Sequence, residues 1–238
     1  MDSSNTLTII TSTRKSEAEV EEWKKNIKST CTTDVNFIVI QNQGDKGLAE
    51  VYNEAMAKSE TDILCFVHDD IDFVMNGWDK KMIDIFDSNQ EYGILGVVGA
   101  KQYSNGGWWH SQQKYHVGQI LHSKNGLTWF SEYSPYVDFP ILEEVCTIDG
   151  LFIGVNKQKI KLPFDDDFKG FHFYDVSFCI RNFLEGCKIG VSNDIRVLHF
   201  GLGNWNTDAW HQANLLMQGK YGENLPVSTK EKYNGKNE

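Results

Sequence analysis

Thr61-Asp-Ile-Leu-Cys-Phe-Val-His-Asp-Asp-Ile-Asp72 is the stretch that decides how this chain folds. Its apolar run, Ile63 to Val67, is rich in β-branched and aromatic residues and predicts a buried strand. The run ends abruptly in His68, Asp69 and Asp70. Acidic groups at the end of a buried strand are costly unless something compensates their charge, and a divalent cation that carries phosphate oxygens would do so. Taken alone, the segment also fits a strand that runs into a solvated acidic turn.

Composition narrows the class of protein. The chain has 238 residues, enough for one α/β domain, and a net charge of −10. That charge argues against a nucleic-acid partner and against a polybasic membrane anchor. No apolar segment approaches the roughly 20 residues that span a bilayer, and the polar start lacks a signal-peptide pattern. We therefore expect a cytoplasmic protein with a single domain over 1–222 and a polar tail over 223–238.

The first half of the chain alternates strand and helix patterns. Strands are predicted at 7–11, 36–40, 63–67 and 94–98, and Ser16 with Glu19 forms the pattern of a helix capping box. Such alternation predicts a mostly parallel sheet with helices on both faces. Ligands of such sheets bind beyond the carboxyl ends of the strands, so those ends should meet along one crevice.

The second half has a different pattern. A Gly-rich aromatic segment at 105–110 contains Trp108 and Trp109. Short strand patterns follow, and a helix is predicted from Asp175 to the C-cap residue Gly186. Asp175 fits the N-cap of that helix, since Asp is favoured there, and a carboxylate at that position stays ionised near the helix dipole.

Five segments in a fixed order resemble parts of one enzyme family. His68-Asp-Asp70 lies where the family carries an Asp-x-Asp motif, and Leu48-Ala-Glu-Val-Tyr-Asn53 is similar to its helix with an Asn near the nucleotide. Asp149-Gly-Leu-Phe-Ile-Gly154 resembles the acceptor-side strand, Phe171 to Arg181 the helix that bears the catalytic base, and Val197-Leu-His199 the strand whose His completes a metal site. The family is that of the family 2-like glycosyltransferases with the GT-A fold, and the resemblance runs from about Leu7 to Tyr221.

The resemblance implies both a fold and an activity. The fold is GT-A, a Rossmann-like α/β architecture with a mostly parallel central sheet flanked by helices and a small antiparallel acceptor-side sheet. The activity is a metal-dependent, inverting transfer of a sugar from a nucleotide diphosphate donor, with a UDP-sugar favoured, to a hydroxyl of a glycan, lipid-linked or protein acceptor. It suggests biosynthesis of cell-surface polysaccharide, in the cytoplasm or at the inner membrane face, by a chain whose association into a homodimer is left open.

The resemblance also assigns roles to particular residues. Asp175 is the expected general base, and Asp70, His199 and His68 are the expected ligands of Mn²⁺ or Mg²⁺. The residues expected to bind the nucleotide sugar are Thr11, Ser12, Arg14, Gln41, Asn42, Asn53, His68 and Asp69. Those expected at the acceptor are Trp108, Trp109, Asp149, Gly150 and His172.

The chain departs from the family pattern at two kinds of position. His68 replaces the first acid of Asp-x-Asp, which favours manganese and other transition metals, and Tyr174 replaces one acid of the pair before the helix. Gln41 and Asn42 stand where an Asp often holds the nucleobase. These departures leave a second hypothesis open, that the chain is a degenerate domain that binds a sugar or sugar nucleotide without turnover. A phosphatase of the haloacid dehalogenase type is disfavoured, because its motif should end the first strand of the fold, not the third.

Overall fold

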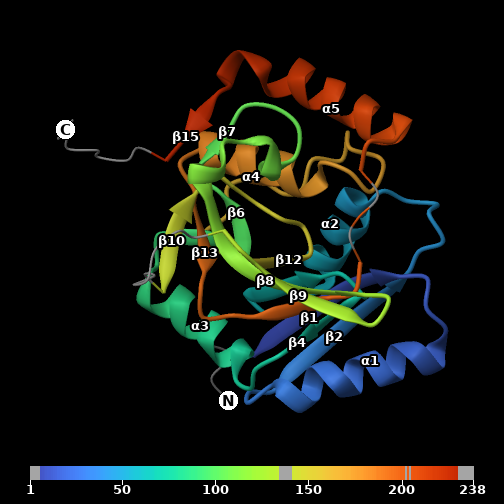
Figure 1. Cartoon of the computed structure of the whole chain (residues 1–238). Helices are drawn as coiled ribbons and strands as arrows, with labels where there is room; N and C mark the ends of the chain where they lie inside the picture. Colours follow the sequence, from blue (N-terminus) through green and yellow to red (C-terminus); the bar gives the residue numbers. More distant parts are fainter. Residues whose placement is uncertain (1–5, 134–140, 202, 204, 230–238) are drawn as a thin grey trace.

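The computed structural model describes residues 6–133, 141–201, 203 and 205–229, which form two main sheets, a two-stranded ribbon and the covering helices (Figure 1). The larger sheet has seven strands in the order β10-β13-β5-β12-β3-β1-β2. Its strands are β1 (Leu7–Thr13), β2 (Val35–Gln41), β3 (Ile63–Val67), β5 (Tyr92–Gly96), β10 (Leu142–Val145), β12 (Phe152–Asn156) and β13 (Lys188–Ser192).

A second sheet lies over the end of β3, where the acidic cluster begins. It runs in the order β11-β6-β8-β14-β4, with β9 paired to β8. Its strands are β4 (Ile71–Phe73), β6 (Val98–Ala100), β8 (His116–Lys124), β9 (Leu127–Glu132), β11 (Thr147–Ile148) and β14 (Val197–His199). A two-stranded ribbon joins β7 (Gln102–Tyr103) to β15 (Val227–Ser228), which lies in the segment that the sequence assigns to a polar tail.

The predicted α/β fold is confirmed, although the large sheet is mixed and not mostly parallel. β1 pairs in parallel with β2 and β3, and β13 pairs in parallel with β5. β12 instead runs antiparallel between β3 and β5 because the chain enters it from the second sheet without a crossover helix. The second sheet is mostly antiparallel, as expected, and β8 and β14 are its parallel pair.

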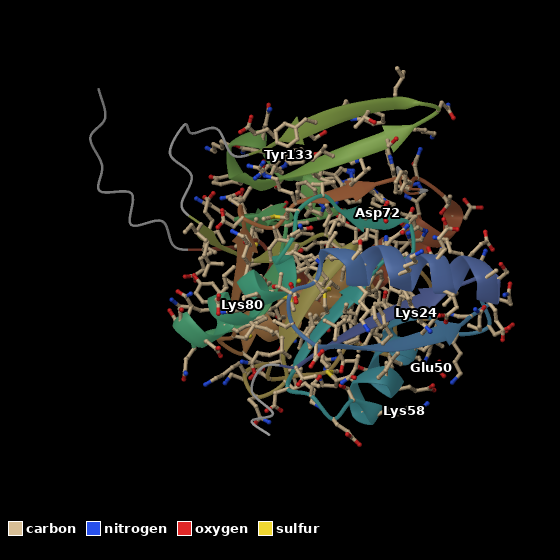
Figure 2. All side chains as sticks on the ribbon, turned by 90° about the horizontal axis from the view of Figure 1, so that it is seen from below. Lys24, Glu50, Lys58, Asp72, Lys80 and Tyr133 are labelled. Atoms are coloured by element: carbon tan, nitrogen blue, oxygen red, sulfur yellow. The ribbon has the colours of Figure 1, made fainter. Side chains whose placement is uncertain are left out.

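The pleat of the central strands distributes their side chains between two cores. Ile9 and Cys65 pack with α1 (Glu17–Thr30) and α3 (Trp78–Ser88), whereas Ile10 and Phe66 pack with α2 (Leu48–Lys58) and α4 (Tyr174–Leu184). Neighbouring residues of a strand point to opposite faces, so one continuous apolar run fills both cores. Lys24 on α1 and Lys80 on α3 lie on the outer surface (Figure 2).

Local signals in the sequence account for the ends of the helices. The predicted capping box is present, since Ser16 accepts from the backbone N–H of Glu19 and the Glu19 carboxylate accepts from that of Ser16. α5 (Asp208–Tyr221) packs against α4 through Trp210 and Met217. Among the described residues, no helix has both the length and the apolar character needed to cross a membrane.

One predicted strand is divided in the structure. The sequence predicts a strand over 94–98, but β5 ends at Gly96 and β6 begins at Val98. The chain passes from the large sheet to the second sheet at Val97, whose buried side chain remains in the core between them. The apolar run continues across this step because both strands are buried, so hydrophobicity alone does not reveal it.

Candidate active site

Two histidines and one aspartate converge where β3 ends. The described residues include one cluster suited to a metal ion, His68, Asp70 and His199, whose ligand atoms all lie within 4.8 Å of one another. Nδ1 of His68 is 3.9 Å from the Asp70 carboxylate, and Nε2 of His199 is 3.4 Å from it. The structure therefore brings together the three residues that the sequence proposes as metal ligands.

Strand pairing places these residues side by side. β14 pairs antiparallel with β4, with His199 opposite Ile71, and the backbone N–H of Phe200 donates to the carbonyl of Asp70 at 2.9 Å. Gly201 lets the chain pass close to the cluster. A Cβ on Gly201 would lie 2.4 Å from the Asp70 carboxylate oxygen and 3.1 Å from Nε2 of His199. A larger residue at 201 would therefore push the cluster apart.

The electrostatics of the cluster suit a divalent cation. Burial lowers the pKa of His68, which keeps its imidazole neutral and able to bind a metal. Burial alone would also lower the pKa of His199 and raise that of Asp70, but their mutual hydrogen bond and charges outweigh burial and shift both pKa values the other way. Two imidazoles with one carboxylate form a donor set that suits Mn²⁺ and related metals better than Mg²⁺.

A cleft of about 260 Å³ lies on one side of the cluster, at the carboxyl ends of β1 and β2. We call it the donor cleft because most of the residues predicted to bind the donor line it. Its lining residues are Ser12, Thr13, Arg14, Asn42, Leu48, Tyr52, His68, Asp69, Asp70 and Phe171. The position agrees with the general rule that ligands of α/β sheets bind beyond the strand ends.

Polar groups of the donor cleft are held in place by hydrogen bonds. The hydroxyl of Thr13 donates to the Asp69 carboxylate, and the Lys15 ammonium donates to the Asp69 carbonyl. The Arg14 guanidinium lies over the ring of Phe171, 5.5 Å from its centroid. Asn42 orders its own loop, since its amide donates to the Lys46 carbonyl at 2.9 Å. Arg14 is thus a cationic group at the wall of this cleft.

Three residues predicted for the donor lie outside this cleft. The Thr11 hydroxyl is buried and donates to the carbonyl of Val67 at 2.8 Å. The Gln41 amide donates to the Lys15 carbonyl at 3.0 Å. The Asn53 side chain both donates to and accepts from the backbone of Phe164, at 2.9 Å in each case. All three side chains hold neighbouring segments together.

A larger cavity of about 390 Å³ lies on the other side of the cluster, and we call it the acceptor cavity. It contains every residue predicted for the acceptor. Its lining residues are His68, Asp70, Val98, Gly107, Trp108, Trp109, Ile120, His122, Tyr133, Asp149, Gly150, Leu151, Phe171, His172, Phe173, Tyr174, Asp175, Val176, His199, Gly203, Trp205 and Trp210. The cavity and the donor cleft share His68, Asp70 and Phe171.

The two tryptophans predicted at the acceptor differ in exposure. Trp108 is only 3% exposed, and its indole N–H donates to the Asp149 carboxylate at 2.7 Å. The other oxygen of Asp149 accepts from the backbone N–H of Leu151 at 3.0 Å. Trp109 is 38% exposed and Trp205 is 54% exposed. Trp108 therefore fixes Asp149, while Trp109 and Trp205 present free ring surface to a ligand.

Asp175 lies in the first turn of α4 and faces the acceptor cavity. Burial and, to a smaller extent, the Asp149 carboxylate raise the pKa of Asp175 to about 7, against the opposing effect of backbone N–H donors that include Gly150. A carboxylate with a pKa near the operating pH is suited to take up a proton from a substrate. The helix N-cap is Phe173, so the sequence-based interpretation of Asp175 as the N-cap residue itself is wrong by two positions.

The sequence patterns did not predict several of the residues that line the cleft and the cavity. His122 and Tyr133 lie in segments that carry no motif and reach the site only through tertiary packing. Tyr52 lies in the Leu48–Asn53 segment, where only Asn53 was predicted to bind the donor, yet it is Tyr52 that lines the donor cleft. His122 is opposite His199 in the pairing of β8 with β14, so strand register alone could have indicated it. Tyr133 lies beside the β8–β9 hairpin (Figure 2).

Comparisons with solved structures place the fold among the GT-A transferases. The crystal structure of GalNAc-T7 with UDP, GalNAc and Mn²⁺ aligns with a TM-score of 0.56 at 10% identity, over 92% of this chain and 49% of that one. The mannosyltransferase PcManGT from Pyrobaculum calidifontis, in complex with GDP-Man and Mn²⁺, aligns with a TM-score of 0.56 at 9% identity, over 94% of this chain and 65% of that one. The chain thus spans about half to two thirds of these structures, and such likenesses show the fold.

The family follows from a comparison of sequence. Residues 8–215 match the model of a family described as "Glycosyltransferase like family". The chain belongs to this family and is an enzyme of the glycosyltransferase class. No curated protein matches it in sequence.

Proposed function

We propose that the protein is a metal-dependent, inverting glycosyltransferase that binds a nucleotide diphosphate sugar in the donor cleft and a sugar hydroxyl in the acceptor cavity. The observation that carries this proposal is that the two hollows meet at His68, Asp70 and Phe171. A donor and an acceptor bound in them would approach each other at the metal cluster. Asp175 lines only the acceptor side, where a base is needed.

The residues of the site can perform each part of a direct displacement. An acceptor hydroxyl in the cavity gives its proton to the Asp175 carboxylate as its oxygen bonds to the anomeric carbon of the donor sugar. The bond from that carbon to the diphosphate oxygen breaks, and the nucleoside diphosphate leaves with the electron pair. A divalent cation held by His68, Asp70 and His199 would neutralise charge on the diphosphate. One displacement inverts the anomeric configuration.

From the charge of the acceptor cavity we infer that the acceptor unit is an uncharged sugar. No Lys or Arg is present among the described residues that line the cavity, whereas Asp70, Asp149 and Asp175 are. A uronic acid or phosphorylated sugar would therefore find no basic Lys or Arg side chain to pair with among these described residues and would meet carboxylates. Exposed rings of Trp109 and Trp205 suit the apolar faces of a neutral pyranose. A charged group elsewhere on a lipid-linked or protein acceptor would have to stay outside the cavity.

The donor is proposed to be a UDP-sugar with Mn²⁺. One structural neighbour carries UDP with Mn²⁺ and another carries GDP-Man with Mn²⁺, so the fold accommodates either base. Arg14 faces the donor cleft and is the proposed phosphate contact.

Product analysis tests the proposal. The wild-type chain is incubated with a panel of UDP- and GDP-sugars and Mn²⁺, and release of the nucleoside diphosphate is measured with and without neutral and uronic-acid saccharides. We expect release that is stimulated by a neutral saccharide, abolished by EDTA and lost in Asp175→Asn, with a product whose anomeric carbon has the opposite configuration by NMR. Retained configuration would contradict the inverting mechanism, and full turnover in EDTA would contradict metal dependence.

A further inference from the structure

The two positions at which the chain departs from the family's acidic motifs are in direct contact. Nε2 of His68 lies 2.8 Å from the phenol oxygen of Tyr174, although the residues are 106 positions apart in the sequence. Tyr174 is only 3% exposed, and its hydroxyl donates to the carbonyl of Gly150 at 3.0 Å. Two ionised carboxylates at these positions could make neither contact, because each would only accept hydrogen bonds.

If both contacts of the Tyr174 hydroxyl are hydrogen bonds, counting protons assigns the tautomer of a neutral His68. A phenol has one proton, and the Gly150 carbonyl can only accept, so the Tyr174 proton lies on the hydrogen bond to Gly150. The phenol oxygen must then accept from His68, which requires a hydrogen on Nε2. A neutral imidazole protonated at Nε2 has its lone pair at Nδ1. Nδ1 is the atom that faces the Asp70 carboxylate, at 3.9 Å.

We propose that Tyr174 is a positioning residue that holds His68 in the tautomer and ring orientation in which Nδ1 can bind a divalent cation. The inference rests on the proposed metal-dependent function. An ionised Asp at position 68 would have no tautomer to fix, because either of its carboxylate oxygens can bind a metal. An imidazole offers one lone pair, and an outer hydrogen bond decides where that lone pair points.

The surroundings of Tyr174 are shaped for this contact. A Cβ on Gly150 would lie 2.1 Å from the Tyr174 phenol oxygen, so glycine is required for the hydroxyl to reach both partners. The Tyr174 ring itself packs edge-to-face against Tyr52, with centroids 5.7 Å apart. Tyr174→Phe therefore deletes the hydrogen bonds while the ring remains packed.

A double-mutant cycle on Mn²⁺ binding tests the proposal. Calorimetric titration with MnCl₂ alone is carried out on the full chain as wild type, Tyr174→Phe, His68→Asp and the double variant. Loss of an outer hydrogen bond to a metal-binding histidine weakens binding about 10- to 100-fold, so we expect a loss of that size for Tyr174→Phe in the wild-type background. In the His68→Asp background the same change should alter affinity less than about twofold, because a carboxylate has no tautomer to fix.

A spectroscopic measurement separates positioning from a general structural effect. Pulsed electron paramagnetic resonance of bound Mn²⁺ detects coordinated imidazole nitrogen, and we expect two such couplings in the wild type and one in Tyr174→Phe. Tyr103→Phe is the matched control, since the Tyr103 hydroxyl is equally buried and has no partner among the described residues. It should leave Mn²⁺ affinity and both couplings unchanged.

The outcomes distinguish this inference from the function on which it rests. Unchanged Mn²⁺ affinity in Tyr174→Phe, or an equal loss in both backgrounds, would overturn the positioning role while leaving metal binding intact. A wild-type chain that binds no Mn²⁺ would overturn the proposed metal-dependent function and the positioning role with it.

Discussion

Replacing the proposed base should make the protein more stable at alkaline pH. The pKa of Asp175 is raised from 3.8 to about 7 in the folded state, mainly by burial. At a pH above 7 the carboxylate is ionised in both states, so the folded state bears the full cost of the buried charge. A pKa difference of this size corresponds to about 4 kcal/mol. Partial exposure of Asp175 lets water screen the charge, and we expect about 1–3 kcal/mol.

The sign of the effect follows from where the proton is bound. Between pH 3.8 and about 7 the folded state holds a proton on Asp175 that the unfolded state has lost. The contribution of Asp175 to stability is therefore fully present below pH 3.8 and is lost as the pH rises to about 7. Asn has a similar shape and no charge, so Asp175→Asn should gain stability relative to the wild type as the pH rises from 5 to 8.

Urea unfolding at pH 5 and pH 8, with EDTA present, measures this difference. Asp79→Asn is a control of opposite sign. Burial alone would raise the pKa of Asp79, but hydrogen bonds from Thr33 and Thr32 outweigh it and lower the pKa, so its carboxylate stabilises the fold above pH 4. Asp79→Asn should lose about 1–3 kcal/mol at pH 8. An Asp175→Asn variant that is less stable than the wild type at pH 8, or whose stability difference does not change with pH, would refute the reasoning.

Three further predictions concern activity. The value of kcat/KM should fall about tenfold per pH unit below about pH 7, because Asp175 must be ionised to accept a proton, and a profile flat down to pH 5 would exclude it as the base. Arg14→Ala should weaken UDP binding about tenfold in calorimetry through loss of a charge-assisted phosphate contact, whereas Lys24→Ala, on the outer face of α1, should leave it unchanged. Trp109→Ala should raise the acceptor KM about fivefold with the donor KM unchanged, and a change in the donor KM alone would contradict the assignment of the two hollows.

Sequence patterns predicted the parts of the fold that depend on local periodicity. The apolar run of β3, the capping box at Ser16 and the start of α4 near Asp175 all follow from spacing within a few residues. The antiparallel placement of β12 and the division between β5 and β6 were not predictable. All of these strands are buried and have apolar sequences, so the sequence pattern does not distinguish them. Direction and sheet membership depend on tertiary packing.

The same distinction between local patterns and tertiary packing applies to the candidate site. His68, Asp70 and His199 were proposed from the order of motifs, and strand pairing brings them together. Thr11 and Asn53 were expected at the donor, but their side chains hold backbone groups instead. The sequence could not show this, since a polar residue near a strand end or on a helix fits a ligand or a neighbouring segment equally well. The contact of His68 with Tyr174 required coordinates, because it joins segments 106 residues apart.

Calorimetric titration of the chain with UDP, in Mn²⁺ and in EDTA, tests the central claim most directly. Asp70→Asn removes the carboxylate at the centre of the cluster, and Asp72→Asn, on the neighbouring strand β4 and outside the cluster, is its control (Figure 2). We predict that the wild type and Asp72→Asn bind UDP at least tenfold more tightly with Mn²⁺ than in EDTA, and that Asp70→Asn loses this difference. Equal UDP affinity in Mn²⁺ and EDTA for the wild type, or an undiminished Mn²⁺ effect in Asp70→Asn, would contradict the account.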